Sequence, residues 1–349
     1  MSRVKAYLKI LGSYFNLKAL NLKARKPVFT SYSITYRCNL RCLYCSNWRI
    51  RGYELNTAQA LKVIDKIGDS EVAIVDFSGG EPTLRRDLEV LAGRLHEYGC
   101  ITSMNTNGLL INERRAKQIA KVFDYVTVSI DGPPEVNDMI RGDGTYFKSV
   151  NALRNLRREG VRVGVNTVIS KSNINTLPKF IDDIIDEVDY LTLQPIHSSN
   201  IEDLKINNIK ILNLVNSIVK AKRENPGKIP LTYSYIYGFI NYFKGRIKKI
   251  CDACKLYFAV NPNGDVSACG ARGDIVLGNM LSKDLNSILL DGYLKALNAI
   301  NSCGGCWLTC TTALSLSLKT SITENLNLAR AILTSSHHYK TRTSRTKRI

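Results

Sequence analysis

The sequence of 349 residues contains no run of 18 uncharged apolar residues and has little histidine. A membrane-spanning helix needs roughly 20 predominantly apolar residues, so none is expected. The basic start of the chain lacks an apolar segment followed by a small-residue cleavage site. This disfavours a secretory signal and predicts a cytoplasmic protein. The four histidines (His96, His197, His337 and His338) form no recognisable set of metal ligands, although His197 follows a predicted strand and is a candidate acid or base.

Acidic residues are missing from both ends of the chain. Residues 1–53 carry eleven Lys and Arg before the first carboxylate, Glu54, and residues 325–349 carry six more with no acid. The net charge of +19 therefore belongs to the ends, since the intervening body is nearly neutral. Basic ends are often solvated tails. They also allow contact with anionic lipid headgroups or with nucleic-acid phosphates.

The segment Val4–Leu20 has the pattern of a basic amphipathic helix, with apolar residues at helical spacing and lysines between them. Two interpretations stay open. The helix packs on the body of the protein, or it lies in the interface of an anionic membrane and places the protein peripherally at the inner face of that membrane.

From Pro27 onward, short apolar strand patterns alternate with longer helical patterns. Strands are predicted at 28–35, 72–77, 101–105, 125–130, 161–168 and 190–193, and helices near 57–67, 87–98, 112–122, 145–159 and 176–187. Near-continuous apolar strands that alternate with helices predict a parallel sheet buried on both faces. Six units without two more predict a partial (β/α)6 barrel of the α/β class. Chemistry in such sheets is expected at the carboxyl ends of the strands.

The organisation changes after the sixth unit. Residues 199–250 are predicted to link two domains, with helices near 205–222 and 231–243, although the tyrosines at 233, 235 and 237 alternate at the period of extended chain. Residues 251–310 hold six cysteines and predict a small α+β module organised by metal. The full division is 1–26 basic helix, 27–198 barrel, 199–250 link, 251–310 cysteine-rich module, 311–335 helix, 336–349 disordered tail.

The ten cysteines fall into two groups and one isolated residue. Cytosolic cysteines at close spacing more often bind metal or act in catalysis than form disulfides. The first group is Cys38, Cys42 and Cys45. The second group is Cys251, Cys254, Cys269, Cys303, Cys306 and Cys310. Cys100 heads an apolar run and is predicted to be a buried structural thiol.

The first group offers three thiolates, one fewer than a structural zinc site needs. Three thiolates suit a [4Fe-4S] cluster whose fourth iron is left for another ligand. The spacing C-x3-C-x2-C, with Tyr44 before the last cysteine, resembles the signature of the radical S-adenosylmethionine (SAM) superfamily. The stretch "SGGEP" at 78–82 resembles that family's glycine-glycine-glutamate-proline motif. The family's partial barrel of six units agrees with the count of strands above.

This resemblance implies that SAM chelates the unique iron through its amino and carboxylate groups. Gly79 and Gly80 would let the main chain approach the methionine ammonium, and Glu81 would bind that ammonium. Weaker implied contacts with the cofactor come from later strand ends and from the aromatic position of the cysteine motif. These residues are Tyr44, Asn105, Ser129, Arg141 and Asn166.

The activity implied is reductive cleavage of SAM to methionine and a 5′-deoxyadenosyl radical, which takes a hydrogen atom from a substrate C–H bond. The implied electron donor is a flavodoxin or a ferredoxin. The sequence identifies no catalytic residue beyond the cofactor ligands, because the cofactor itself supplies the difficult step.

The second group resembles the C-terminal extension called SPASM, or its one-cluster version Twitch, which carries auxiliary iron–sulfur clusters. Cys254 is followed by a predicted hairpin that turns at Gly264 and returns to Cys269, and Cys303-Gly-Gly-Cys306 follows later. The series ends at Cys310, short of the full two-cluster pattern, which favours one auxiliary [4Fe-4S] cluster. The implied ligands are Cys254, Cys269, Cys303 and Cys306, with Cys251 and Cys310 as further candidates. A zinc ribbon is the structural alternative.

The substrate stays open at this stage. Relatives with such extensions act on peptides or proteins or on small molecules, and the basic ends add a lipid-linked precursor at a membrane. An RNA-modifying enzyme is compatible with the charge, but no RNA-binding motif is visible, so nucleic acid is an unfavoured partner. A non-catalytic iron–sulfur carrier or sensor is the alternative from another class, and the "SGGEP" motif argues against it.

Overall fold

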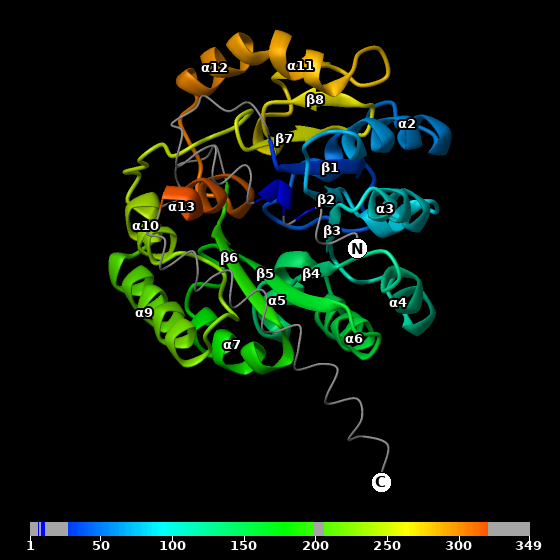
Figure 1. The fold of residues 1–349 in the computed structure, drawn as a ribbon. Helices are drawn as coiled ribbons and strands as arrows, with labels where there is room; N and C mark the ends of the chain where they lie inside the picture. The colour runs from blue at the N-terminus through cyan, green and yellow to red at the C-terminus, as the bar shows by residue number, and fades with distance from the viewer. Residues whose placement is uncertain (1–5, 7, 11–26, 198–205, 320–349) are drawn as a thin grey trace.

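The computed structural model describes residues 6, 8–10, 27–197 and 206–319. In this part of the chain nine strands form one sheet in the order β6-β5-β4-β3-β2-β1-β7-β8-β9 (Figure 1). The strands are β1 Phe29–Thr35, β2 Ile74–Gly79, β3 Ile101–Thr106, β4 Tyr125–Ser129, β5 Arg162–Ile169, β6 Tyr190–Pro195, β7 Tyr257–Val260, β8 Asp265–Ser267 and β9 Val276–Asn279. No helix among the described residues is long and apolar enough to cross a membrane.

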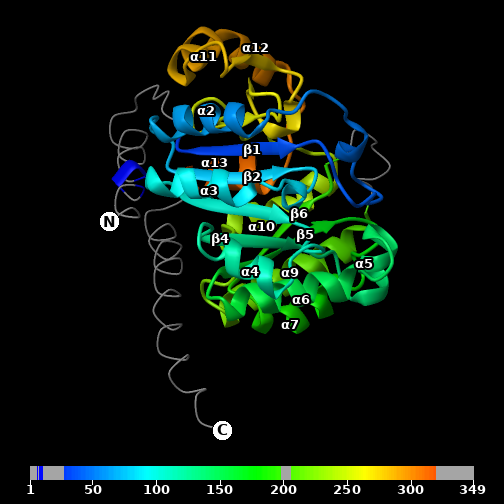
Figure 2. The same cartoon turned by 90° about the vertical axis from the view of Figure 1, so that its right-hand side faces the viewer.

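Strands β1 to β6 are parallel neighbours and curve into an open barrel. The predicted partial (β/α)6 barrel is therefore confirmed. Helices cover its outer face, and α9 and α10 follow β6 (Figures 1 and 2). The barrel helices are α2 Thr57–Gly68, α3 Leu88–Glu97, α4 Glu113–Ile119, α5 Pro134–Arg141, α6 Thr145–Arg158 and α7 Leu177–Ile184, followed by α9 Asn208–Glu224 and α10 Tyr233–Phe243.

The sequence pattern did not predict α5. The helix begins at Pro134, a residue type that suits the first helical position, directly after Pro133, and it is short. The extended period of the tyrosines in α10 was also misleading, because that segment is a helix capped by the Thr232 side chain, which accepts a hydrogen bond from the Tyr235 amide. Tyr235 is fully buried and Tyr237 is half exposed, as expected for two faces of one helix.

The cysteine-rich segment continues the barrel sheet. Strand β7 pairs in parallel with β1, from Phe29 opposite Tyr257 to Tyr32 opposite Val260, and β8 and β9 follow as antiparallel strands. Helices α11 Leu285–Asp291, α12 Tyr293–Ser302 and α13 Leu314–Lys319 complete this part. The auxiliary cysteines are thus fixed to the edge of the same sheet that carries the first group.

The segment before α13 is fastened to α10 by Trp307. Its indole stacks on the Tyr235 ring with 5.8 Å between centroids and 12° between planes. The indole Nε1 donates to the Tyr235 carbonyl (3.0 Å), and the Tyr235 hydroxyl donates to the Trp307 carbonyl (2.8 Å). Gly238 lies under the indole, because a Cβ there would be 1.9 Å from Trp307 Cζ2. This contact holds the last cysteines against the barrel.

The start of the chain is described over a few residues, and these contact the barrel. Ala6 is fully buried in a small cluster with Ala73 and Ile101, at the amino ends of β2 and β3. The Lys9 ammonium donates to the carbonyls of Ser70 (2.6 Å) and Val72 (3.1 Å). Of the two interpretations of the basic helix, packing on the body holds for these residues. The remainder of the predicted helix and the predicted C-terminal tail lie outside the described residues.

Gly238→Ala tests the fastening at Trp307. We expect the variant to be destabilised by about 2 kcal/mol, because a methyl group cannot fit without displacing the indole. Gly93→Ala in α3 is the matched control, since its Cβ would meet Val122 at an ordinary 3.4 Å. Alanine should stabilise that helix by about 0.5–1 kcal/mol. Chemical denaturation under anaerobic conditions measures both, and equal effects would contradict the packing described.

Candidate active site in the barrel cavity

The carboxyl ends of the barrel strands surround a cavity of about 610 Å³. All eleven residues predicted to hold the first cluster and its cofactor line it: Cys38, Cys42, Tyr44, Cys45, Gly79, Gly80, Glu81, Asn105, Ser129, Arg141 and Asn166. They come from four strands, β2 to β5, with the turn that follows β2, from the loop after β1 and from α5. The cavity also reaches the second cysteine segment through Gly270, Leu308 and Cys310.

The first three cysteines lie in the loop that follows β1. All three are free thiols of intermediate burial. The loop is fixed at its base by Glu54, which accepts from the Thr35 hydroxyl (2.8 Å) and the Tyr36 amide (2.7 Å). At its far side the Leu43 amide donates to the Ile140 carbonyl (3.0 Å). The loop is therefore held from both ends while its thiols face the cavity.

Two glycines at the end of β2 make the close contact that seats this loop. The Gly80 amide donates to the Thr35 carbonyl (2.8 Å), and the Glu81 amide donates to the Arg37 carbonyl (2.8 Å). A Cβ at Gly80 would lie 2.0 Å from the Arg37 carbonyl oxygen. Gly79 has a φ of +121°, where its Cβ would lie 2.4 Å from the Thr35 carbonyl oxygen. Side chains at either position would push the cysteine loop away from the strand.

Glu81 has a structural task in addition to the one predicted from the motif. Its carboxylate is 1% exposed and accepts from the Thr83 amide (3.0 Å), the Thr83 hydroxyl (2.6 Å), the Thr106 hydroxyl (2.7 Å) and the Asn107 amide (2.8 Å). These bonds join the ends of β2 and β3. Asn107 in turn donates to the Asn39 side chain of the cysteine loop (2.7 Å). One carboxylate thus holds three segments in register at the cavity mouth.

Tyr44 and Arg141 form a buried network with Asp131. The Tyr44 hydroxyl donates to Asp131 Oδ2 (2.8 Å), and Arg141 pairs with the same carboxylate (2.8 Å) and donates to the Tyr44 hydroxyl (2.6 Å). Burial raises the pKa of Tyr44 well above its usual value, so the phenol stays protonated. Burial alone would lower the pKa of Arg141, but Asp131 outweighs it and raises that pKa, so the guanidinium stays charged. The predicted aromatic position therefore anchors the cysteine loop to α5.

Burial favours the neutral form of two thiols of the loop, Cys38 and Cys42. Burial raises the pKa of Cys42 to about 11, although the nearby Arg141 acts to lower it. Burial also raises the pKa of Cys38. Iron binding requires thiolates, so loading a cluster here must release protons.

Below this mouth the barrel interior carries polar side chains that sequence patterns missed. Asp76 on β2 accepts from the Ser103 hydroxyl (2.7 Å) and the Asn105 amide (2.7 Å), both on β3. The Thr127 and Tyr190 hydroxyls share a hydrogen bond (2.8 Å), and the Tyr190 ring packs against Gly164. The sequence carries one signal for these side chains. Asp76 and Ser78 alternate with apolar residues in β2, which places both on the inner face of the sheet.

The open side of the barrel is closed by the end of the cysteine-rich segment. The Thr309 amide and hydroxyl both donate to the Gln194 side chain at the end of β6 (3.2 and 3.0 Å). Cys310, in the following π-helical turn, lines the barrel cavity. It was predicted among the candidates for the auxiliary site, and the structure places it at the cavity wall between the two cysteine groups.

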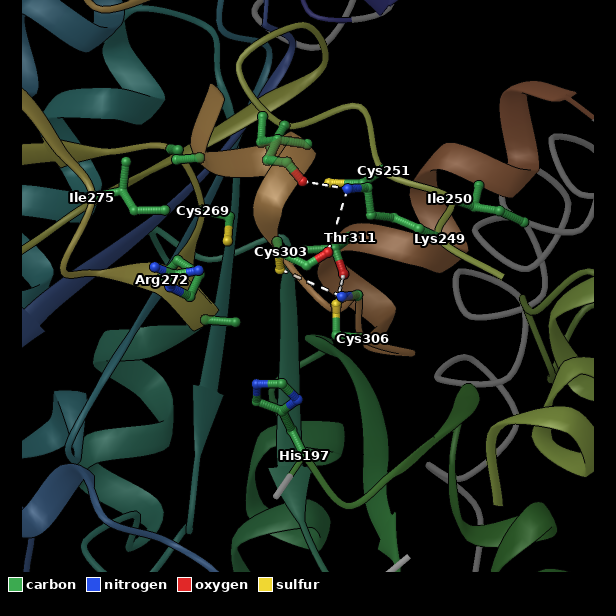
Figure 3. A pocket seen from close by; sticks show the side chains of 16 residues that line it. His197, Lys249, Ile250, Cys251, Cys269, Arg272, Ile275, Cys303, Cys306 and Thr311 are labelled. Atoms are coloured by element: carbon green, nitrogen blue, oxygen red, sulfur yellow. Dashed lines mark hydrogen bonds between the residues drawn. The ribbon is translucent and has the colours of Figure 1, made fainter. Parts of the chain in front are cut away.

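A second, smaller cavity of about 60 Å³ lies beside the barrel cavity (Figure 3). Four cysteines line it: Cys251, Cys269, Cys303 and Cys306. His197 lines both cavities, and burial lowers its pKa, so it is a neutral side chain between them. The predicted candidates Cys269, Cys303 and Cys306 are therefore brought together, with Cys251 as the fourth.

Cys254 lies directly behind this cavity. It lines a neighbouring hollow together with Cys251 and is 2% exposed. Its φ of +60° is the one positive value among the described non-glycine residues, a conformation that costs an L-residue about 1–2 kcal/mol. Burial raises its pKa to about 12, and the charges of Cys269 and Cys251 add to this effect. Cys254 thus lies beside Cys251 on the side away from the barrel cavity.

Known proteins resemble this chain over the barrel. The family model described as "Radical SAM superfamily" matches residues 32–189. The chain is 37% identical over 166 residues to the Fe-coproporphyrin III synthase of Methanosarcina barkeri, which covers 46% of this chain and 41% of that protein. It is 36% identical over 160 residues to the mycofactocin maturase MftC of Mycobacterium tuberculosis, covering 44% and 41%. The matches span about two fifths of the length of these curated relatives.

Solved structures extend the likeness in fold to the cysteine-rich segment. The structure of Streptococcus suis SuiB bound to S-adenosylmethionine superposes with a TM-score of 0.64 at 17% identity, over 88% of this chain and 78% of that chain. A second structure shows SuiB bound to its precursor peptide SuiA, with a TM-score of 0.64 at 18% identity, over 88% and 76%. At this identity the likeness shows the fold. The predicted barrel and its C-terminal extension therefore share an established architecture.

Asp76 makes the stability of the fold depend on pH. Burial raises its pKa from 3.8 to about 6, although Ser103 and Asn105 act to lower it. The folded state therefore favours the protonated carboxyl, and stability is lost as pH rises from the unfolded value through 6. Asp76→Asn removes this loss. We expect its stability relative to the parent protein to improve by about 1 kcal/mol between pH 5 and pH 8.

Unfolding at the two pH values under anaerobic conditions measures this change. Asp143→Asn is the matched control, because Asp143 is exposed and the substitution makes the same change of charge. A pH-independent difference between the parent protein and Asp76→Asn would show that Asp76 does not carry the buried charge.

Proposed function

Residues 32–189 are a radical SAM domain, and on this premise we propose that the chain is a radical SAM enzyme with one auxiliary [4Fe-4S] cluster. The observation that carries the proposal is the barrel cavity. Three free thiols, two glycines that expose the main chain and a polar inner wall all face a single space of about 610 Å³. A redox carrier or sensor would not need this volume beside its cluster, so the cavity favours an enzyme over the non-catalytic alternative.

The residues present fit a [4Fe-4S] cluster and SAM. Cys38, Cys42 and Cys45 would be the three protein ligands, and the missing fourth leaves one iron for the cofactor. The main chain at Gly79 and Gly80, which lines the cavity, would receive the methionine part. Asn105, Ser129 and Asn166 offer amide and hydroxyl groups at the ends of β3, β4 and β5 for the rest of the molecule.

When bound, this pair supplies a 5′-deoxyadenosyl radical that takes a hydrogen atom from the substrate. The chain's own residues position the cysteine loop and shield the cavity. The Tyr44, Asp131 and Arg141 network fixes the cysteine loop. The Gln194–Thr309 contact closes the open side of the barrel, which limits the access of water and of competing hydrogen donors.

For the auxiliary cluster we propose Cys251, Cys254, Cys269 and Cys306. Cys251, Cys269 and Cys306 line one cavity, and Cys254 lines the neighbouring hollow with Cys251. Burial raises the pKa values of Cys254, Cys269 and Cys306, and the charges of neighbouring thiols add to this effect. Cys303 lines the same cavity, but it lies beside the Arg272 side chain, which is paired with Asp274 (2.7 Å). This set replaces Cys303 by Cys251 in the set predicted from the motif. Cys310 is assigned to the barrel wall.

A zinc ribbon is less well supported. Among the described residues, no three cysteine, histidine or carboxylate side chains converge as ligands of one metal ion do. A cluster of four irons holds its thiolates farther apart than a single ion does, which suits the spread of these cysteines.

Peripheral membrane contact remains a subordinate proposal. Ala6 and Lys9 are engaged with the barrel, and Leu8 is exposed between them. A small electron-transfer protein of the flavodoxin or ferredoxin class is the proposed reductant.

The enzyme activity has a direct test. The reduced protein incubated with SAM should release 5′-deoxyadenosine and methionine even without substrate, through uncoupled cleavage. Replacing Cys38, Cys42 and Cys45 together by alanine should abolish this release, because the first cluster loses its ligands. Chromatography with mass spectrometry detects both products.

Cys100→Ala is the control for this experiment. Cys100 is a core thiol that contacts the Val72 carbonyl (3.6 Å), so its variant should keep the activity. No 5′-deoxyadenosine from the parent protein, with its cluster shown to be present and reduced, would refute the enzyme assignment.

Iron analysis tests the auxiliary ligand set. The reconstituted parent protein should bind about eight irons, and Cys254→Ala or Cys306→Ala should bind about four. Cys303→Ala and Cys310→Ala should keep close to the full content. Loss of iron in Cys303→Ala but not in Cys251→Ala would instead support the set predicted from the motif, and stoichiometric zinc would contradict an auxiliary cluster.

A further inference from the structure

Asp76 lies deep in the barrel cavity. It precedes Ser78 by two residues on β2, so both side chains point to the same inner face, and Asp76 is about 7 Å farther from the mouth. The sheet register places Ser31 of β1 and Ser103 of β3 beside it. The carboxylate lines the cavity although it is 8% exposed.

The carboxylate has neutral partners. Ser103 donates to one oxygen and Asn105 to the other, each at 2.7 Å. Among the residues that the structure describes, no Lys, Arg or His lies within salt-bridge distance of Asp76. A buried carboxylate without a cationic partner is costly, and natural proteins keep such groups where a ligand or a reaction needs them.

The other charged groups on the cavity wall are already engaged. Arg141 is paired with Asp131, and Glu81 accepts four hydrogen bonds from protein groups. His197 is neutral, because burial lowers its pKa. Asp76 therefore brings a negative charge deep into the cavity that no described cationic side chain balances.

The rest of the inner wall is polar and uncharged. Hydroxyl and amide side chains from all six barrel strands line it: Ser31, Ser33, Ser78, Asn105, Thr127, Asn166, Thr192 and Gln194. Such a wall suits a ligand with several hydrogen-bonding groups, and the Asp76 carboxylate, set deep among them, selects the charge of that ligand.

We propose that Asp76 is the anchor for a cationic ammonium group of the substrate, which makes an amine-bearing polar molecule or side chain the substrate class. The carboxylate sits below the proposed SAM contacts, so an ammonium bound there would hold the neighbouring part of the substrate toward the mouth. A substrate with carboxylates at this depth would be repelled. The inference deepens the proposed function, since it takes the barrel cavity as the place of the substrate.

Binding of simple probes tests the anchor. The probes are n-butylammonium and its neutral counterpart n-butanol, added to the unreduced, cluster-loaded protein with SAM present. Saturation-transfer NMR titrations give the apparent Kd of each. A charge-assisted bond to Asp76 should make the ammonium probe bind about tenfold more tightly than the alcohol. This comparison within the parent protein does not depend on any variant folding.

Two substitutions locate the effect. In Asp76→Asn the preference for the ammonium probe should disappear, so that the two probes bind about equally. The amide keeps the polarity of the side chain and removes its charge. Asp143→Asn, an exposed aspartate outside the cavity, should keep the full preference. Iron content and circular dichroism confirm that the variants are folded.

Equal binding of the two probes to the parent protein would overturn the proposal. So would an ammonium preference that survives in Asp76→Asn. Weaker SAM binding in Asp76→Asn with unchanged ammonium preference would assign the carboxylate to the cofactor instead. The unreduced protein cannot cleave SAM, so these results are independent of the 5′-deoxyadenosine assay, and either proposal can fail alone.

Discussion

The close approach of two main-chain segments at Gly80 is the constraint on which the site depends. The cysteine loop after β1 and the turn after β2 exchange backbone hydrogen bonds at a distance that leaves no room for a side chain, since a Cβ would stand 2.0 Å from the Arg37 carbonyl oxygen. This contact sets the three thiols over the carboxyl ends of the parallel strands. Glu81 and the Tyr44–Asp131–Arg141 network then extend the same fixation to β3 and α5.

The second half of the chain uses the barrel as its support. Strand β7 adds to β1 on the free edge of the sheet, and Trp307 stacks on α10 beyond the other edge. The cysteine-rich segment is therefore attached at both sides of the opening. Its last turn crosses the gap, where Thr309 contacts Gln194 and Cys310 faces the barrel cavity. Two groups of thiols consequently flank one enclosed space, with His197 between them.

The sequence predicted the features that depend on local pattern. The six barrel strands were found because short runs rich in β-branched and aromatic residues alternate with longer helical patterns, and the cysteine loop because its ligands are close in the chain. It did not predict α5, whose few apolar positions carry little periodic signal. The helix predicted near 231–243 is confirmed as α10, against the extended period of its tyrosines. The position of Cys310 at the barrel cavity depends on a π-helical turn, which the spacing of the cysteines in the sequence does not predict. Asp76 was missed because a lone polar residue in an apolar strand gains its meaning from the neighbouring strands.

The central claim is that the fourth iron position of the first cluster is left for SAM. Electron–nuclear double resonance on the reduced protein with SAM labelled by ¹⁵N in its amino group measures this most directly. Direct coordination of the SAM amino group to the cluster predicts a ¹⁵N hyperfine coupling that disappears when unlabelled SAM is used. A reduced cluster with bound SAM but no ¹⁵N coupling would show that the fourth iron is not the binding position of SAM.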